Sequence, residues 1–160
     1  MESLPGHGSC FVCGNTDPHS IGIIWQKNPN GRIESTFAFN FHQQGPPGLV
    51  HGGASAAVMD ETMGTASLAG RVPGSYCSSR IGLSKTEPDW GRNLSSRQFF
   101  FVEGIHSITT QGEIYLPDGT VAVEVRGLHA LAPQLYQDIP KSSKYTIRIC
   151  DHGKWLFSTK

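Results

Sequence analysis

The 160-residue sequence is poor in charge and contains no long apolar run. Asp, Glu, Lys and Arg make up 16% of the residues, against about 25% in an average globular protein. Thirteen basic residues balance thirteen acidic ones, so the basic excess of a nucleic-acid-binding protein is absent. No stretch reaches the roughly 18 apolar residues of a membrane span. We therefore expect a small-molecule partner, no nucleic acid, no membrane span, and a surface partly covered in a homo-oligomer.

The beginning of the sequence and its cysteines exclude two further classes of protein. Met1 to Ser9 lack the basic and apolar regions of a secretory signal, so we expect a cytoplasmic protein. Four cysteines are too few and too scattered for a disulfide framework. Cys10 and Cys13 form a C-x-x-C, but no second pair and no H-x₃-H supplies further ligands. We expect a turn there, with zinc as the less favoured alternative, and therefore neither a metal nor a cofactor.

Strand-like segments flank one helix candidate. Ile21 to Gln26 and Ile33 to Phe41 are β-branched and aromatic, and the turn sequence Asn28-Pro29-Asn30-Gly31 separates them, which predicts a hairpin. Alternation in the second segment predicts a buried face made by Phe37, Phe39 and Phe41. After the helix candidate come four further strand-like segments: Ser75 to Thr86, Arg92 to Glu103, Ile105 to Tyr115 and Thr120 to Leu131.

The helix candidate runs from Gly52 to Gly70, and eleven of its nineteen residues are Gly, Ala or Ser. Such small side chains let neighbouring backbones approach closely, so we expect a central helix wrapped by the strands. The order of elements predicts an α+β domain in which an antiparallel sheet curls around a single helix. We place this domain at residues 1–132. The more basic residues 133–160, in which Tyr145, Ile147 and Ile149 alternate, form an extension expected to pack on the domain or on a neighbouring subunit.

The start of this helix carries the best candidate for chemistry. Pro47 to Gly53 lead directly into the helix, whose first free N–H groups form a site for an oxyanion or another anion. Asp60 follows eight residues after Gly52, and no Lys or Arg occurs between Arg32 and Arg71. Eight helical residues span roughly 12 Å, so one chain cannot bring both groups to one bond. If both act on one carbonyl, an antiparallel helix of a second subunit must supply one of them.

The segment from Gly45 to Gly64, GPPGLVHGGASAAVMDETMG, resembles the signature of hotdog-fold acyl-CoA thioesterases of the PaaI and 4-hydroxybenzoyl-CoA thioesterase type. Three other segments are similar to the same superfamily: the leading Cys10 to Gly14, Arg80 to Leu83, and Gly112 to Leu128. The resemblance implies a hotdog dimer, often paired into a tetramer, that hydrolyses acyl-CoA without metal.

The resemblance also implies roles for individual residues. The Gly52 N–H would bind the thioester carbonyl, and Asp60 of the partner subunit would act as base or nucleophile. Gly53 belongs to the same substrate-binding turn. His51 either belongs to the catalytic group, bracing this turn, or simply caps or packs against the helix start. The residue that binds the carbonyl in many relatives falls near Gly45 here, which leaves Gln44 as a substitute. A hydroxyl that positions water in relatives is assigned to Ser78.

The sequence is also compatible with structural roles for these acids and with other functions. Asp60 could be a structural acid, and Glu61 points about 100 degrees away from it, so we expect Glu61 to be solvated or paired. The main alternative function is a non-catalytic acyl-CoA-binding or regulatory hotdog protein, which would need the pocket but not the acid. A hydratase or dehydratase is less favoured because no His lies at a spacing suited to pair with Asp60.

Overall fold

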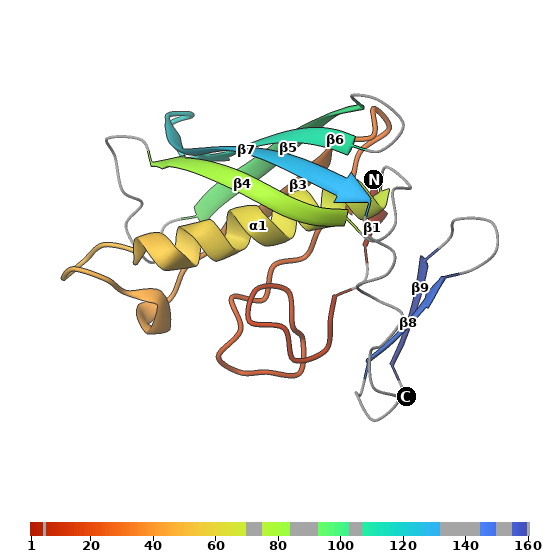
Figure 1. Cartoon of the computed structure of the whole chain (residues 1–160). Helices are drawn as coiled ribbons and strands as arrows, with labels where there is room; N and C mark the ends of the chain where they lie inside the picture. Colours follow the sequence, from red (N-terminus) through yellow and green to blue (C-terminus); the bar gives the residue numbers. More distant parts are fainter. Residues whose placement is uncertain are drawn as a thin grey trace.

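The computed structural model describes the backbone of residues 1–4, 6–69, 75–83, 93–102, 107–131, 145–149 and 155–159, and side chains within 1–4, 6–66 and 108–129. One helix and one large antiparallel sheet dominate (Figure 1). The elements, in chain order, are β1 (Glu2–Ser3), β2 (Gln26–Lys27), β3 (Ile33–Ala38), the 3₁₀ turn η1 (Phe41–Gln43), α1 (Gly52–Ala69), β4 (Ser75–Leu83), β5 (Asn93–Val102), β6 (Ser107–Tyr115), β7 (Val121–Leu131), β8 (Tyr145–Ile149) and β9 (Trp155–Thr159).

The seven-stranded sheet has the order β1-β2-β3-β5-β6-β7-β4, and every neighbouring pair is antiparallel. The predicted helix and the four predicted strands after it are confirmed, with ends that differ by a few residues. The strand order is less simple than the chain order, because β4 leaves α1 and joins the far edge beside β7 while β5 returns to pair with β3. This arrangement confirms the expected α+β class, a curled antiparallel sheet over one central helix.

The first hairpin is present but shorter than predicted. Asn28 holds its turn, since its Oδ1 accepts the N–H groups of Asn30 and Arg32. Phe37 and Phe39 are buried, but the expectation for Phe41 is wrong, because this side chain is 65% exposed. The reason is local: Asn40 and Gln43 form a capping box that turns the chain into η1, so the strand alternation ends before Phe41.

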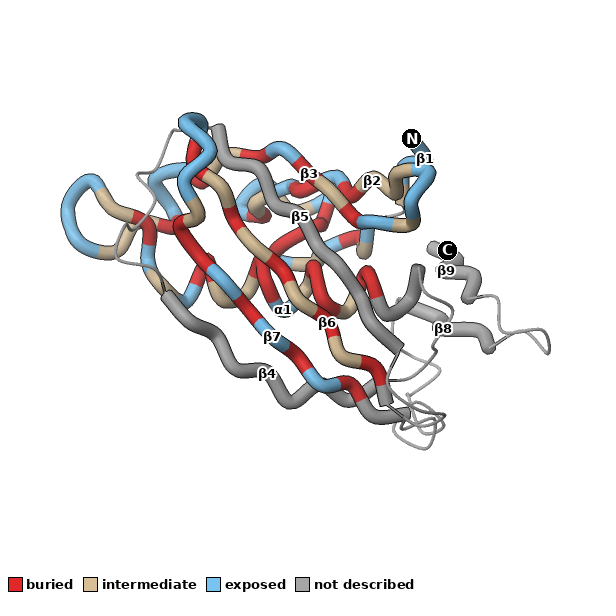
Figure 2. The backbone as a smooth tube through the Cα atoms, turned by 90° about the horizontal axis from the view of Figure 1, so that it is seen from above, coloured by how far each residue is buried: buried red, intermediate tan, exposed pale blue. Residues whose placement is uncertain are grey.

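Helix α1 packs against the concave side of the sheet, and residues 6–25 pass along its other side (Figure 1). Its buried side chains recur every three or four positions, as a core-facing helix requires. They are Ala54, Ser55, Val58, Met59, Thr62, Met63, Thr65 and Ala66. Buried residues also alternate with exposed ones along β7 (Figure 2). The helix is therefore central, as predicted, but not enclosed on every side.

The strands β8 and β9 pair only with each other and form a separate two-stranded sheet. In this register Ile147 lies opposite Phe157, and Ile149 lies opposite Trp155, which places the alternating apolar residues on one face of the hairpin. The rest of the extension, 132–144, 150–154 and 160, lies outside the described residues. Its packing on the domain or on a neighbour stays a prediction. Within the described part of the chain, no helix combines the length and hydrophobicity needed to cross a membrane.

Candidate active site at the start of helix α1

The chain reaches helix α1 through a tight, glycine-dependent loop. Pro46 to Leu49 form a turn closed by the Leu49 N–H, which donates to the Pro46 carbonyl at 2.9 Å. Gly48 has a φ of 85°, in the left-handed region that favours glycine at this turn position. A second hydrogen bond, from the His51 N–H to the Gln43 carbonyl at 2.8 Å, ties the end of the loop to its beginning. The loop thus fixes the direction in which the helix starts.

His51 caps the helix. Its Nδ1 accepts the Gly53 N–H at 2.9 Å, and its carbonyl accepts the Ala54 N–H at 2.8 Å. A Cβ atom at position 53 would lie 2.9 Å from that Nδ1, and one at position 45 would lie 2.9 Å from the His51 Cα. Gly45 and Gly53 therefore make room for the cap on both sides. The structure shows this capping role, and a catalytic role for His51 stays a prediction.

Gly52 is the first residue of α1, and its N–H has no acceptor among the described residues. The first N–H groups of any helix lack intrahelical partners and lie at the positive end of the helix dipole. The Gly53 N–H is already occupied by His51, so Gly52 supplies the open donor of this pair. The geometry can stabilise a negatively charged oxygen at the helix start.

Asp60 lies two helical turns further along and is exposed in the single chain. The expectation that the strands wrap the whole helix is therefore wrong at Asp60 in a single subunit, because the flanking positions on this face carry small side chains. Partial burial against the helix surface, and then the adjacent Glu61 carboxylate, raise the pKa of Asp60 above its ordinary value. A carboxylate with a raised pKa is a stronger base once ionised.

Asp60 belongs to a stripe of small residues along the helix, formed by Gly53, Ala56, Ala57, Asp60 and Gly64. At 3.6 residues per turn these positions lie on one face, and none of them is buried. Gly64 is informative because a Cβ atom there would meet nothing within 4 Å, so no contact within the described chain requires glycine. Glycine inside a helix costs about 1 kcal/mol relative to alanine. The stripe is smooth enough for a second helix to lie against it.

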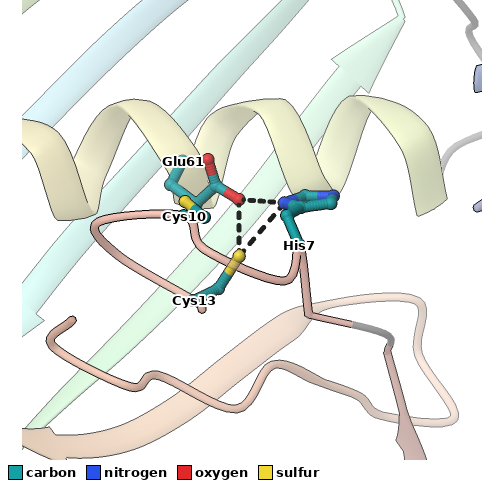
Figure 3. A group of neighbouring side chains, drawn as sticks. All are labelled: His7, Cys10, Cys13 and Glu61. Carbon is teal, nitrogen blue, oxygen red and sulfur yellow. Dashed lines mark hydrogen bonds and ion pairs between the residues drawn. The ribbon is translucent and has the colours of Figure 1, made fainter. Parts of the chain in front are cut away.

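Glu61 lies about 100 degrees around the helix from Asp60 and meets the N-terminal loop. Its Oε1 lies 2.8 Å from His7 Nδ1 and accepts the Cys13 thiol at 3.1 Å (Figure 3). Burial alone would raise the pKa of Glu61, but the hydrogen bonds from His7 and Cys13 outweigh it and lower the pKa. Burial, and the adjacent Glu61 carboxylate, raise the pKa of the Cys13 thiol well above its ordinary range. Of the two expectations for Glu61, pairing is correct.

The remaining predicted residues are only partly placed. Gln44 is half-buried and forms an isolated β-bridge with Val50, next to the His51 turn. Ser78 lies in β4 opposite Leu128, and its side chain is outside the described set. Sequence reasoning missed the contact of Glu61 with His7 and Cys13. One signal was available, since His7 precedes Cys10 by the same three-residue step that separates Cys10 from Cys13.

Comparison with known proteins supports the fold and points to one group. No family model and no curated protein matches the sequence. Among solved structures, a thioesterase superfamily protein is 29% identical with a TM-score of 0.66, and the match covers 74% of this chain and 61% of that one. The chain thus spans less than two thirds of that relative.

Two further structures have lower identity and show the fold alone. The PaaI protein of E. coli is 16% identical with a TM-score of 0.61, covering 70% of this chain and 80% of that one. A hypothetical thioesterase from Streptococcus pneumoniae, solved with coenzyme A, is 16% identical with a TM-score of 0.61, covering 68% and 84%.

The fold and the helix start define a hotdog protein of the α+β class. Within that class, the solved structures that the chain resembles include a thioesterase superfamily protein and a PaaI protein, the group to which the segment from Gly45 to Gly64 is similar.

Proposed function

We propose that the protein is an acyl-CoA thioesterase that acts as a homodimer or a dimer-based tetramer. The observation that carries the proposal is the open Gly52 N–H at the start of a helix whose exposed face presents Asp60 two turns later. The 29% identical thioesterase superfamily protein and the coenzyme A bound by the Streptococcus pneumoniae protein support this substrate class.

The two groups need two subunits. Gly52 and Asp60 are separated by eight residues of one continuous helix, or roughly 12 Å. An antiparallel helix from a second subunit, lying along the stripe of small residues, brings the partner's Asp60 toward Gly52. A two-fold axis then makes two equivalent sites.

The chemistry follows from these positions. The thioester oxygen accepts a hydrogen bond from the Gly52 N–H. This bond stabilises the charge that develops on the oxygen and lowers the activation free energy by about 3 kcal/mol. The partner's Asp60 removes a proton from water as the water oxygen bonds to the carbonyl carbon. The carbon–sulfur bond then breaks, the proton held by Asp60 passes to the leaving sulfur, and the products are a carboxylic acid and the CoA thiol. His51 positions the helix start, while Gly53, Gln44 and Ser78 contact the substrate.

The direct test replaces the base. Asp60→Asn should lower kcat for acyl-CoA hydrolysis about 100-fold or more, because the amide cannot accept the proton from water. The unfolding midpoint and the Kd for a non-hydrolysable acyl-CoA should stay unchanged. The control is Glu34→Gln, which alters an acid in β3 that accepts a hydrogen bond from Asn28 and should keep full activity.

The outcome also separates the two classes of function. A wild-type protein that binds acyl-CoA but releases no thiol from a panel of acyl-CoAs would establish the non-catalytic alternative. Full turnover by the Asp60→Asn protein would exclude Asp60 as the base.

A mixed dimer tests the arrangement of the subunits. Gly52→Pro removes the N–H at the first helical position, where proline is tolerated, and Gly52→Ala keeps the N–H as its control. Chains with Gly52→Pro and chains with Asp60→Asn should each be inactive and should regain activity after subunit exchange. The mixed dimer holds one intact site, whereas the wild-type dimer holds two. Each mixed dimer should therefore have up to half the activity of a wild-type dimer. An active monomer in sedimentation analysis would refute the arrangement.

A further inference from the structure

The N-terminal loop and helix α1 bring together four potential metal ligands that the proposed hydrolysis does not use. They are the side chains of His7, Cys10, Cys13 and Glu61, and their ligand atoms all lie within 4.8 Å of one another (Figure 3). Three come from one short loop, and the fourth comes from the helix. Cys13 is buried, and the side chains of His7 and Glu61 are only 26% and 22% exposed. The cluster is therefore shielded from water on most sides.

Three of the ligand atoms form a close triangle. The His7 Nδ1 lies 2.8 Å from Glu61 Oε1 and 3.1 Å from Cys13 Sγ, and this Sγ lies 3.1 Å from the same Oε1. If Nδ1 and Sγ both donate to the carboxylate, the two donors remain in contact with each other. A cation enclosed by the three atoms would interact favourably with all of them at once.

The distances suit a small tetrahedral ion. Bond lengths near 2.3 Å for zinc to sulfur and 2.0–2.1 Å for zinc to nitrogen or oxygen separate ligand atoms by about 3.3–3.8 Å. The observed triangle needs to expand by about half an ångström to reach that geometry.

The loop itself is shaped to hold the cysteines. The Val12 N–H donates to Cys10 Sγ at 3.4 Å, and the Gly14 N–H donates to the Cys10 carbonyl at 2.9 Å. A Cβ atom at Gly14 would lie 2.3 Å from that carbonyl oxygen, so only glycine fits the close return of the chain. An N–H donated to sulfur stabilises the thiolate that a metal requires.

The geometry points to a structural Zn²⁺ site formed by His7, Cys10, Cys13 and Glu61, which clamps the N-terminal loop onto helix α1. Two sulfurs, one imidazole and one carboxylate match zinc, whereas magnesium and calcium prefer sites made of oxygen. All four positions of a tetrahedral ion are filled by protein, which leaves none for substrate. The site does not depend on the proposed thioesterase activity, because Glu61 and Asp60 face different sides of the helix.

Metal content is the direct test. The full chain, purified with a thiol reductant and without chelator, should contain about one zinc per chain by plasma mass spectrometry. Cobalt added as CoCl₂ to metal-stripped protein should give the visible bands of tetrahedral coordination and a sulfur-to-cobalt charge-transfer band. Zinc should raise Tm, and a chelator should lower it, because the ion binds the folded chain. A wild-type protein with no zinc and no cobalt bands would overturn the assignment.

Variants locate the site. Cys13→Ser and Glu61→Gln should weaken zinc binding by about 100-fold or more, while Asp60→Asn and His42→Ala should retain the metal. Asp60→Asn is the matched control, because it removes an adjacent acid that faces away from the cluster. Equal zinc binding by wild type and Cys13→Ser would place the metal elsewhere and overturn the proposal. Should the Cys13→Ser chain not fold, the cobalt spectrum of the wild type still decides whether thiolates bind the ion in a tetrahedral site.

Discussion

Asp60 and Glu61 are neighbours in sequence, yet they occupy two different faces of helix α1. Asp60 lies on the exposed stripe of small residues, whereas Glu61 is covered by the N-terminal loop and bonded to His7 and Cys13. The step of about 100 degrees between successive helical residues causes this difference. One face of the helix is free for a second subunit and for chemistry, and the other is used to hold the loop. Two neighbouring carboxylates therefore have different roles because different groups pack beside them.

The largest effects should come from replacing each acid in turn and measuring both stability and activity, which tests whether the two faces of the helix have separate roles. Asp60→Asn should leave the free energy of unfolding within about 0.5 kcal/mol of wild type, as expected for an exposed side chain. Glu61→Gln should lower it by about 1–3 kcal/mol, because a neutral amide oxygen replaces the charged carboxylate that accepts from His7 and Cys13. Urea unfolding of both variants, alongside thiol-release rates, supplies the measurement. A large stability loss in Asp60→Asn would show that the two faces are not separate.

His51 sharpens the comparison at the start of the helix. His51→Ala removes the acceptor of the Gly53 N–H and should cost about 1 kcal/mol of stability, as other N-cap losses do. Its kcat should fall more than its KM rises, because the helix start that carries the Gly52 N–H is less well positioned. His51→Asn keeps a capping acceptor and should restore most of the stability. If alanine and asparagine lower the Tm equally, the capping hydrogen bond is not the source of the lost stability.

Gly64 gives the smallest and most selective effect. Alanine at this position meets nothing within 4 Å in one chain, so Gly64→Ala should stabilise an isolated subunit by up to about 1 kcal/mol. If a second helix lies along the stripe, the added methyl group should instead weaken the dimer. Sedimentation analysis across a dilution series distinguishes these outcomes. A more stable chain with an unchanged dimer would mean that the second helix does not lie along this stripe.

The local features of this fold were readable from the sequence, whereas the contacts between distant segments were not. The helix was predictable because a glycine-rich turn leads into a run of small residues, and the strands because β-branched and aromatic residues cluster between turns. The position of β4 beside β7 was not predictable, since strand pairing across a chain leaves little local signal. Phe41 was assigned wrongly because the Asn40 cap overrides the alternation before it.

In the candidate site, too, the local features were predictable and the contact with a distant segment was not. Gly52 and Asp60 were found from spacing within one helix, and His51 from its place before the first turn. The partner of Glu61 was missed because it lies 54 residues away, on a loop without regular structure. His7 could have been included as a candidate ligand from its spacing to Cys10, but nothing in the sequence indicates which helical acid completes the set.

The contact between His7 and Glu61 also bears on the order of folding. Closing a loop of 54 residues costs more chain entropy than forming the Asn28 hairpin turn or the helix, whose contacts are local. We expect the N-terminal loop to dock late, on a helix and sheet that are already formed. By the same reasoning it is the first part to detach, so amide exchange at residues 6–14 should report a partial opening that leaves the rest of the domain intact.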